Sequence, residues 1–190
     1  MACYTKNTKI MPIKFNLEPY KTNVFIETGT YHGKGCINAI ESGFNEIHSI
    51  EIHAPILEVA KSNLQPYTDK ANICLYIGDS SDTLPIILEN INEPATIWLD
   101  GHDALTDGGG RGKKGCPLYE ELDAIQNHHI KEHIIMIDDL RIINGPQWGD
   151  NHITLDGLKD RLKDINPNYE FFYEDGVIPN DVLIAKIPNN

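Results

Sequence analysis

Acidic residues end five apolar segments of this 190-residue chain, and their placement is the first indication of chemistry. Any one of these acids could simply cap the helix that follows its segment. Capping alone explains a succession of five poorly, because ligands of an open parallel sheet bind beyond the carboxyl ends of its strands. We therefore interpret the acids as a candidate ligand site. They are Glu27, Glu51, Asp79, Asp100 and the pair Asp138-Asp139.

A glycine-spaced turn follows the first of these acids. Gly29, Gly33 and Gly35 come directly after Glu27 and lead into a helix-like segment. Such a turn lets the backbone approach a nucleotide-like ligand at the start of a helix. Because the spacing is GxxxGxG and not the GxGxxG of dinucleotide-binding proteins, we do not expect a dinucleotide here.

Three of the acids can take separate roles toward one ligand. Glu51 lies ~22 residues beyond the glycine turn, where a carboxylate can accept both hydroxyls of a ribose. Asp79 and the backbone amide of Ser80 can reach the edge of an adenine, and Glu27 can meet an amino or hydroxyl group. Phosphates favour backbone amides, Lys and Arg, and only Lys34 lies nearby in the sequence. The pattern therefore favours a ligand with an adenosine end and a cationic end.

Asp100, Asp138 and Asp139 form a second group, from strand ends that we expect to be neighbours. Three carboxylates with room for water suit Mg²⁺, Mn²⁺ or Ca²⁺. The alternative is that Asp138 or Asp139 caps a turn and only Asp100 points into the site. His102 could be a general base, a further metal ligand or a loop histidine. Asp103 is the competing candidate for the base.

Other polar residues receive structural interpretations. We expect His128, His129 and His133 to be solvated residues at the end of a helix and not a metal site. Arg141 follows the aspartate pair, and it could clamp a substrate or neutralise one of the two aspartates.

The elements that must position these residues alternate between strand-like and helix-like patterns. Strands are predicted over 24–28, 47–52, 73–77, 96–99 and 134–137, and helices over 35–42, 54–64, 80–90, 117–128 and 155–165. Ser80 or Ser81 could cap the third of these helices, and Thr154 the last. Two β-rich runs, 169–173 and 182–187, flank a turn-rich segment and predict an antiparallel hairpin. The predicted fold is α/β and Rossmann-like: a seven-stranded, mostly parallel sheet with helices on both faces and a C-terminal antiparallel β-hairpin.

One domain is expected, spanning 23–190 after a polar lead-in over 1–22. A glycine-rich insert at 101–116 interrupts the pattern, and irregular segments of this length are often functional lids. The net charge of −12 argues against nucleic acid and against acidic membranes as partners. The four cysteines form no CxxC pair, and the sequence shows neither a signal peptide nor a membrane-spanning run. We therefore expect the protein to be located in the reducing cytoplasm.

With these residues in place, the chain resembles the class I S-adenosylmethionine-dependent methyltransferases over about 23–186. Glu27-Thr28-Gly29-Thr30-Tyr31-His32-Gly33 is similar to their first motif, Glu51 to their ribose-binding acid, and Gly78-Asp79-Ser80 to their adenine-contacting segment. Trp98-Leu99-Asp100-Gly101-His102 with Ile137-Asp138-Asp139 resembles the metal-dependent O-methyltransferases of the catechol and macrocin types. A group of small proteins shares the wider pattern DGH…P…EL…IDD, here completed by Pro117 and Glu121-Leu122.

The resemblance implies methyl transfer from S-adenosylmethionine to a hydroxyl of a small molecule, with a sugar or polyol as a candidate acceptor. Mg²⁺ or another divalent cation would be held by Asp100, Asp138 and Asp139 beside that hydroxyl. His102 and Asp100 would be catalytic, with His102 taking the proton. The implied cofactor-binding residues are Glu27, Thr28, Gly29, Thr30, Tyr31, Gly33, Glu51, Ile52, Gly78, Asp79, Ser80 and Asp100.

Three alternatives stay open. The first is a metal-independent methyltransferase acting on a nitrogen or a carboxylate. The second is a non-catalytic protein that binds S-adenosylmethionine, for example as a partner subunit. Whatever the function, a homodimer is a candidate assembly. The third is an NAD-dependent oxidoreductase, against which the glycine spacing and the terminal hairpin both count.

Overall fold

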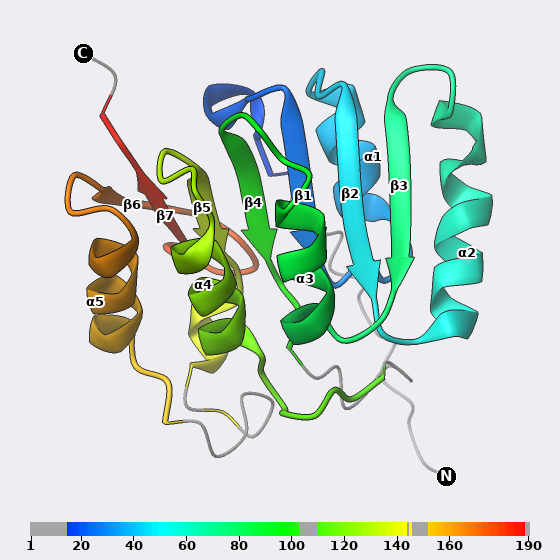
Figure 1. The fold of residues 1–190 in the computed structure, drawn as a ribbon. Helices are drawn as coiled ribbons and strands as arrows, with labels where there is room; N and C mark the ends of the chain where they lie inside the picture. The colour runs from blue at the N-terminus through cyan, green and yellow to red at the C-terminus, as the bar shows by residue number, and fades with distance from the viewer. Residues whose placement is uncertain (1–14, 103–109, 144, 146–151, 189–190) are drawn as a thin grey trace, which may run out of the picture.

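The computed structural model describes residues 15–102, 110–143, 145 and 152–188, which fold around one sheet (Figure 1). The order of its seven strands is β3-β2-β1-β4-β5-β7-β6. The first five pair in parallel, whereas β7 runs antiparallel to both β5 and β6. The predicted fold class, including the antiparallel terminal pair, is therefore confirmed. The strands are β1 Val24–Thr28, β2 Glu46–Glu51, β3 Asn72–Ile77, β4 Ala95–Leu99, β5 Ile134–Ile137, β6 Glu170–Glu174 and β7 Val182–Lys186.

Helices cover both faces of the sheet (Figure 1). One face carries α1 and α2, and the other carries α3, α4 and α5. Their bounds are α1 Lys34–Glu41, α2 Ala54–Leu64, α3 Ser80–Leu88, α4 Leu118–Asn127 and α5 Leu155–Ile165. None of the helices described here is long and apolar enough to cross a membrane.

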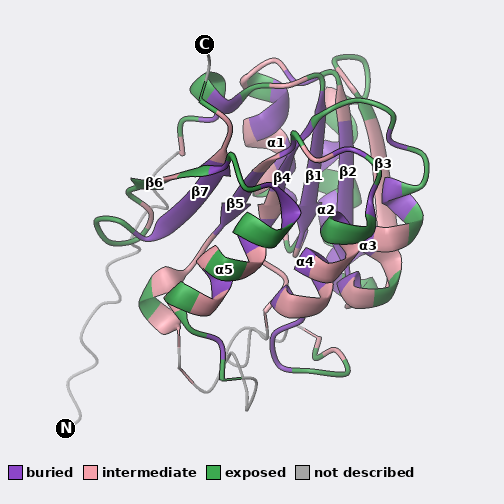
Figure 2. Cartoon of the chain, turned by 60° about the vertical axis from the view of Figure 1, so that its left-hand side comes forward, coloured by how far each residue is buried: buried purple, intermediate pink, exposed green. Residues whose placement is uncertain are grey.

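Two apolar cores result from the alternation of side chains along each strand. In β1, Val24 and Ile26 pack into the core under α3, α4 and α5, whereas Phe25 packs into the core under α1 and α2. Every residue of β1 is buried (Figure 2). Leu17 and Tyr20, within the predicted lead-in, are buried in the second core.

The helix N-termini confirm one predicted cap and correct another. The Thr154 side chain accepts a hydrogen bond from the Gly157 amide, 3.1 Å away, and so caps α5 as expected. The cap of α3 is neither Ser80 nor Ser81 but Asp79, whose carboxylate accepts from the Ser81 amide at 3.0 Å. The reason is that the acid stands one position upstream with extended backbone, which is the geometry of an N-cap.

The prediction of solvated histidines after α4 is wrong for two of the three. His128 and His133 are buried and only His129 is exposed. The Ala95 amide donates to His133 Nδ1 at 3.0 Å, which places the His133 proton on Nε2, 2.8 Å from His128 Nδ1. His128 Nε2 then donates to the carbonyl of Ile91 at 3.1 Å. The pair is buried because the end of α4 faces the start of β4 and not solvent.

Candidate active site

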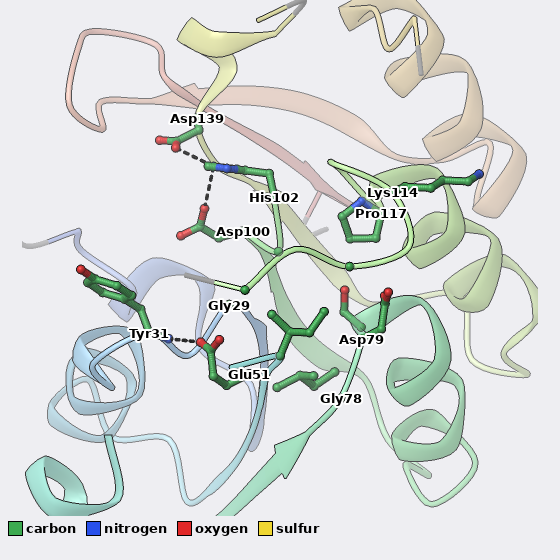
Figure 3. Close-up of a pocket in the computed structure, with 16 residues that line it drawn as sticks. Gly29, Tyr31, Glu51, Gly78, Asp79, Asp100, His102, Lys114, Pro117 and Asp139 are labelled. Atoms are coloured by element: carbon green, nitrogen blue, oxygen red, sulfur yellow. Dashed lines mark hydrogen bonds and ion pairs between the residues drawn. The ribbon is translucent and has the colours of Figure 1, made fainter. Parts of the chain in front are cut away.

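The carboxyl ends of β1 to β4 surround a pocket, which we call the strand-end pocket (Figure 3). It gathers most of the residues that the sequence assigns to a donor. Glu27, Thr28, Thr30 and Gly33 do not line it. The lining residues are Gly29, Tyr31, Ile50, Glu51, Ile52, Gly78, Asp79, Ser80, Asp100, Gly101, His102, Gly110, Gly112, Lys114, Pro117 and Asp139.

The glycine turn packs directly on the end of β4. Gly29 has a φ of +86°, and a Cβ built there would lie 2.3 Å from the carbonyl oxygen of Asp100. Gly33, with a φ of +80°, is the last residue before α1. Only glycine satisfies both requirements at position 29, because L-residues rarely adopt this φ and have no space there. The turn therefore brings bare backbone to the edge of the pocket.

Glu51 joins the glycine turn to the start of α2. One carboxylate oxygen accepts from the Tyr31 amide at 2.8 Å, and the other accepts from the His53 amide at 2.9 Å. Each carboxylate oxygen has a second lone pair, so Glu51 can still accept the hydroxyls of a ribose. It stands at the wall of the strand-end pocket, and its role toward a ribose stays a prediction.

Asp79 is already engaged by its own protein. Its Oδ1 accepts from the amide and the hydroxyl of Ser81, and its Oδ2 accepts from the Lys113 amide at 2.8 Å. These hydrogen bonds outweigh the effect of burial and hold the pKa of Asp79 below its ordinary value. The acid predicted to read adenine thus anchors the insert.

The stretch of the insert over residues 110–116 is called the strap. The Lys113 ammonium pairs with the Asp82 carboxylate at 2.6 Å, and Lys114 pairs with Glu120. A Cβ on Gly110 would lie 2.5 Å from Ile52 Cγ2. The strap therefore passes over the β2 and β3 ends and closes one wall of the strand-end pocket.

A second pocket, the α1 pocket, lies on the other side of the glycine turn. It shares Gly29, Tyr31 and Asp100 with the strand-end pocket, so the two pockets meet at that point. The α1 pocket is lined by Phe15, Leu17, Phe25, Glu27, Gly29, Thr30, Tyr31, His32, Lys34, Gly35, Ile37, Asn38, Glu41, Trp98, Asp100 and Asp138.

Glu27 is the buried acid of the α1 pocket. Its Oε2 accepts from the Ser49 hydroxyl at 2.7 Å and from Cys36 Sγ at 3.2 Å. Burial raises the pKa of Glu27 to about 7, against the opposing effect of these two hydrogen bonds. Gly35 leaves room for the other oxygen, because a Cβ there would overlap Glu27 Oε1. An ammonium group entering the α1 pocket would therefore meet a carboxylate.

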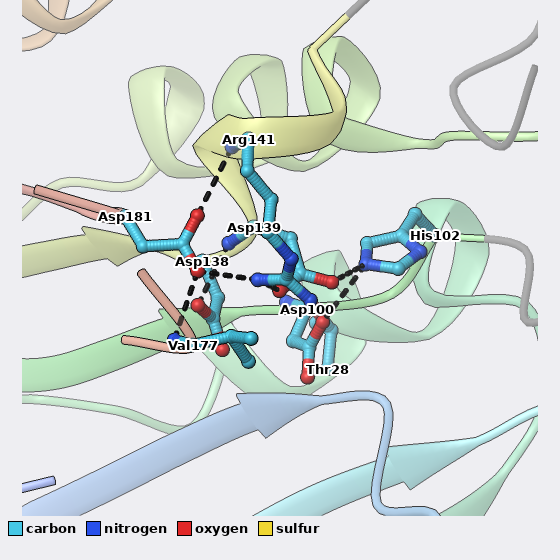
Figure 4. A network of polar contacts seen from close by, with 8 residues as sticks. All are labelled: Thr28, Asp100, His102, Asp138, Asp139, Arg141, Val177 and Asp181. Atoms are coloured by element: carbon cyan, nitrogen blue, oxygen red, sulfur yellow. Dashed lines mark hydrogen bonds and ion pairs between the residues drawn. The ribbon is translucent and has the colours of Figure 1, made fainter. Parts of the chain in front are cut away.

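Asp100, His102 and Asp139 converge beside both pockets (Figures 3 and 4). His102 Nε2 lies 2.7 Å from Asp139 Oδ2 and 3.2 Å from Asp100 Oδ1. One ligand atom from each of the three residues falls within 4.8 Å of the others. Burial lowers the pKa of His102, but hydrogen bonds to the two carboxylates outweigh it and raise this pKa to about 10. Without a cation, His102 is thus an imidazolium and holds its proton at neutral pH.

Asp138 belongs to a different set from Asp100. Its potential ligand atoms group with those of Asp139 and Asp181, and its Oδ1 accepts from the Asp139 amide at 2.7 Å. Burial and the nearby Asp100 carboxylate raise the pKa of Asp138 to about 8. Arg141 pairs with both Asp139 and Asp181 (Figure 4), which fits the neutralising alternative for this arginine.

The donor set fits a divalent cation. Asp100 and Asp139 offer hard oxygen ligands and His102 an imidazole, a mixture that suits Mn²⁺ as well as Mg²⁺. The carboxyls of Asp138 and Asp181 lie close by, and a bound cation would favour the ionised form of Asp138. Asp103, the competing base, lies outside the described residues.

Two acids of the site have no role in the sequence-based prediction. Asp181, at the start of β7, is fully buried and accepts from the amides of Arg141 and Val177, both at 3.0 Å. Glu121 is 1% exposed within α4. A signal for Glu121 exists, because it shares the buried face of that helix with Leu118 and Leu122. The sequence near Asp181 offers no comparable signal.

The comparison with known proteins rests on structure alone. No protein-family model matches the sequence, and no curated protein matches it significantly. The S-adenosylhomocysteine-bound methyltransferase PaMTH1 of Podospora anserina has a TM-score of 0.58 at 13% identity, covering 93% of this chain and 76% of that one. The O-methyltransferase TomG of Streptomyces achromogenes, in complex with S-adenosylmethionine, has a TM-score of 0.59 at 14% identity, covering 91% and 76%.

An O-methyltransferase of Bacillus cereus, in complex with S-adenosylhomocysteine, has a TM-score of 0.60 at 16% identity, covering 90% of this chain and 77% of that one. The chain therefore has the fold of the class I S-adenosylmethionine-dependent methyltransferases. Structures of O-methyltransferases are among those that share it.

Proposed function

We propose that this protein transfers a methyl group from S-adenosylmethionine to a hydroxyl of a small molecule, with the help of a divalent cation. The observation that carries the proposal is the position of Asp100, His102 and Asp139. These residues line the strand-end pocket, and Asp100 also stands where that pocket meets the α1 pocket. The candidate catalytic residues therefore lie next to the candidate donor site.

The two pockets match the two ends of the donor. The adenosine end fits the strand-end pocket, where Glu51 can accept the ribose hydroxyls and Ile52 provides apolar contact. The amino-acid end fits the α1 pocket, where its ammonium group would meet Glu27. Carboxylates at both ends suit a cationic donor and disfavour the pyrophosphate of NAD.

The candidate metal ligands are Asp100, His102 and Asp139, with Asp138 close by. A divalent cation bound there would lower the pKa of an acceptor hydroxyl and orient it. His102 and Asp100 remain the proposed catalytic residues, acting through the cation that they would hold. The protein's own contribution is alignment, since the methyl of a sulfonium is already activated and its transfer depends on in-line geometry. A sugar or polyol remains the proposed acceptor class.

Calorimetry with S-adenosylmethionine and with NAD tests the donor. Binding of the first and not of the second is expected, and the reverse result would refute the proposal. Turnover is then measured as homocysteine release, after hydrolysis of the S-adenosylhomocysteine product, over a panel of sugars, polyols and phenols with and without Mg²⁺ or Mn²⁺. Loss of turnover in Asp139→Asn with donor binding retained would support the metal.

The ion pairs of His102 favour a second candidate, a metal-independent methyltransferase. His102 satisfies both carboxylates without a cation, at 2.7 Å and 3.2 Å. This candidate predicts turnover that is equal with and without a chelator, and the same panel extended to amines and carboxylates distinguishes it.

A further inference from the structure

Glu121 is a buried acid that donor binding and metal binding leave unexplained. It lies in the first turn of α4, where Glu120 pairs with Lys114 while Glu121 points inward. Burying a carboxyl group costs several kcal/mol in solvation unless other groups compensate it. No cation pairs with Glu121 among the residues that the structure describes, and its Oε1 has no hydrogen-bond partner there. A carboxyl in this position therefore needs a reason other than packing.

The contacts of Glu121 reach the ends of three separate elements. The hydroxyl of Thr28, at the end of β1, and that of Ser80, at the start of α3, act on its carboxyl group and oppose the burial that raises the pKa of Glu121 to about 7. Gly101, which follows β4, packs against all three side chains. A Cβ on Gly101 would lie 2.8 Å from Glu121 Oε1, 3.1 Å from Ser80 Oγ and 3.2 Å from Thr28 Oγ1. Three polar oxygens thus lie against the backbone of Gly101.

The direction of these hydrogen bonds links Glu121 to Asp100. The Asp100 amide donates to Thr28 Oγ1 at 3.1 Å. The Thr28 hydroxyl keeps its own hydrogen for another acceptor, and the Glu121 carboxyl, which lies with Thr28 Oγ1 beside Gly101, can be that acceptor. The relay runs from Asp100 through Thr28 to Glu121, so the position of Asp100 depends on a side chain in α4.

We propose that Glu121 is a positioning residue of the donor site, which holds Asp100-Gly101 and Ser80 in the arrangement that S-adenosylmethionine requires. The inference rests on the proposed function for the identity of the donor. Glu121 would touch neither donor nor acceptor. It acts through Thr28 and Ser80 on the two segments that form the floor of the strand-end pocket.

A positioning role predicts opposite effects on stability and on binding. Glu121→Leu removes a buried carboxyl, so the midpoint of thermal unfolding should stay equal or rise. The same change should weaken S-adenosylmethionine binding about tenfold, measured by calorimetry, while Glu121→Gln, which keeps one acceptor oxygen, should weaken it less. Asp123→Asn is the matched control on α4, because Asp123 pairs with Arg161 at the surface, and it should change neither quantity.

Hydrogen exchange gives a readout that does not depend on activity. The amide of Asp100 should exchange faster in both Glu121 variants, because the Thr28 hydroxyl that accepts from it loses an anchor. Thr28→Val should weaken donor binding as well, and the double variant with Glu121→Leu should lose less than the sum of the two, since both act on one relay.

The outcomes separate the two proposals. If the wild-type protein binds no S-adenosylmethionine, the proposed function fails and this inference fails with it. If the wild type binds while the Glu121 variants bind equally well, only this inference fails. A lower unfolding temperature with unchanged donor affinity would make Glu121 a purely structural residue and overturn the proposal. If Glu121→Leu does not fold, the test uses Glu121→Gln, with its affinity for S-adenosylmethionine and the exchange rate of the Asp100 amide hydrogen as the readouts.

Discussion

Glu51 carries two tasks with one carboxylate. It fixes the amides of Tyr31 and His53, and it stands at the wall of the strand-end pocket. A residue that orders the backbone around a ligand cannot be removed without moving the other contacts of that ligand. Loss of the Glu51 carboxylate should therefore weaken donor binding more than the loss of a single hydrogen bond would.

Glu51→Ala is expected to weaken S-adenosylmethionine binding at least tenfold, or about 1.4 kcal/mol. The reason is the loss of the ribose acceptor together with the anchor of the glycine turn. Calorimetry measures the change, and Glu58→Ala, on the exposed side of α2, is the control. An affinity equal to that of the wild type would remove Glu51 from the donor site.

At the same scale, the sequence predicts which residues gather but not what they bind to. The acids at strand ends follow from the strands themselves, and Glu51 lies as expected. Asp79 instead accepts a hydrogen bond from the strap, and Asp138 groups with Asp181, which is distant in sequence. Partners of this kind depend on which segments the topology brings together, and a periodic pattern does not encode that.

At the scale of elements, the strap and the strand ends form the pocket jointly. Gly112 lies against Asp79, since a Cβ on Gly112 would be 2.6 Å from Asp79 Oδ2. Gly112→Ala should push the strap away from α3 and weaken donor binding by about tenfold, roughly 1.4 kcal/mol. Gly157→Ala in α5 is the matched control, because its Cβ would be similarly close, 2.8 Å, to Tyr119 Oη but away from both pockets. Equal donor affinity in both variants would exclude the strap from the site.

The histidine pair connects the end of α4 to the start of β4, and its protonation should destabilise the fold. Burial, with the neighbouring His128, lowers the pKa of His133 to about 4. The unfolded chain, with a pKa near 6.5, then binds the proton more readily. This contribution to stability is complete above about pH 6.5 and is lost as the pH falls toward 4, on the order of 3 kcal/mol in total.

Comparison of variants isolates that loss, because buried acids with raised pKa values, such as Glu27, act in the opposite direction. Denaturant unfolding between pH 7 and pH 4 should show a smaller acid loss for His133→Asn, whose amide oxygen can still accept from Ala95 but cannot titrate. His129→Asn, at the exposed neighbour, should follow the wild type. An unchanged pH dependence in His133→Asn would contradict the assignment.

The order and type of the elements were predictable because apolar spacing is local. The strand 24–28 and the helices 54–64 and 155–165 agree with the structure at both ends. The end of the third helix was not predictable, and α3 stops at Leu88 where Asn90 was expected. Nor was the burial of His133, since it depends on how α4 packs against the start of β4.

At the scale of the whole molecule, four acidic side chains meet at one place. They are Asp100, Asp138, Asp139 and Asp181. Among the described residues, the basic groups that pair with this cluster are His102 and Arg141. The chain as a whole carries a net charge of −12. A divalent cation that binds only the folded protein would stabilise it by mass action.

Mn²⁺ or Mg²⁺ at about a hundred times its Kd should therefore stabilise the fold by about 2.7 kcal/mol. Scanning calorimetry should show a rise of roughly 5 °C or more in Tm, which a chelator reverses. Asp139→Asn should lose most of this rise, whereas Asp69→Asn, an acid outside the cluster, should keep it. A rise of the same size in both variants would show that the ion binds elsewhere.

The place of β7 in the sheet has a consequence for synthesis on the ribosome. β7 follows β6 in the chain, yet it lies between β5 and β6. While residues 182–186 are still inside the exit tunnel, β5 presents an unpaired edge and Arg141 lacks Asp181. Exposed strand edges of this kind invite pairing with other chains. The nascent protein is therefore most vulnerable to aggregation just before the strand that completes both the sheet and the acidic cluster emerges.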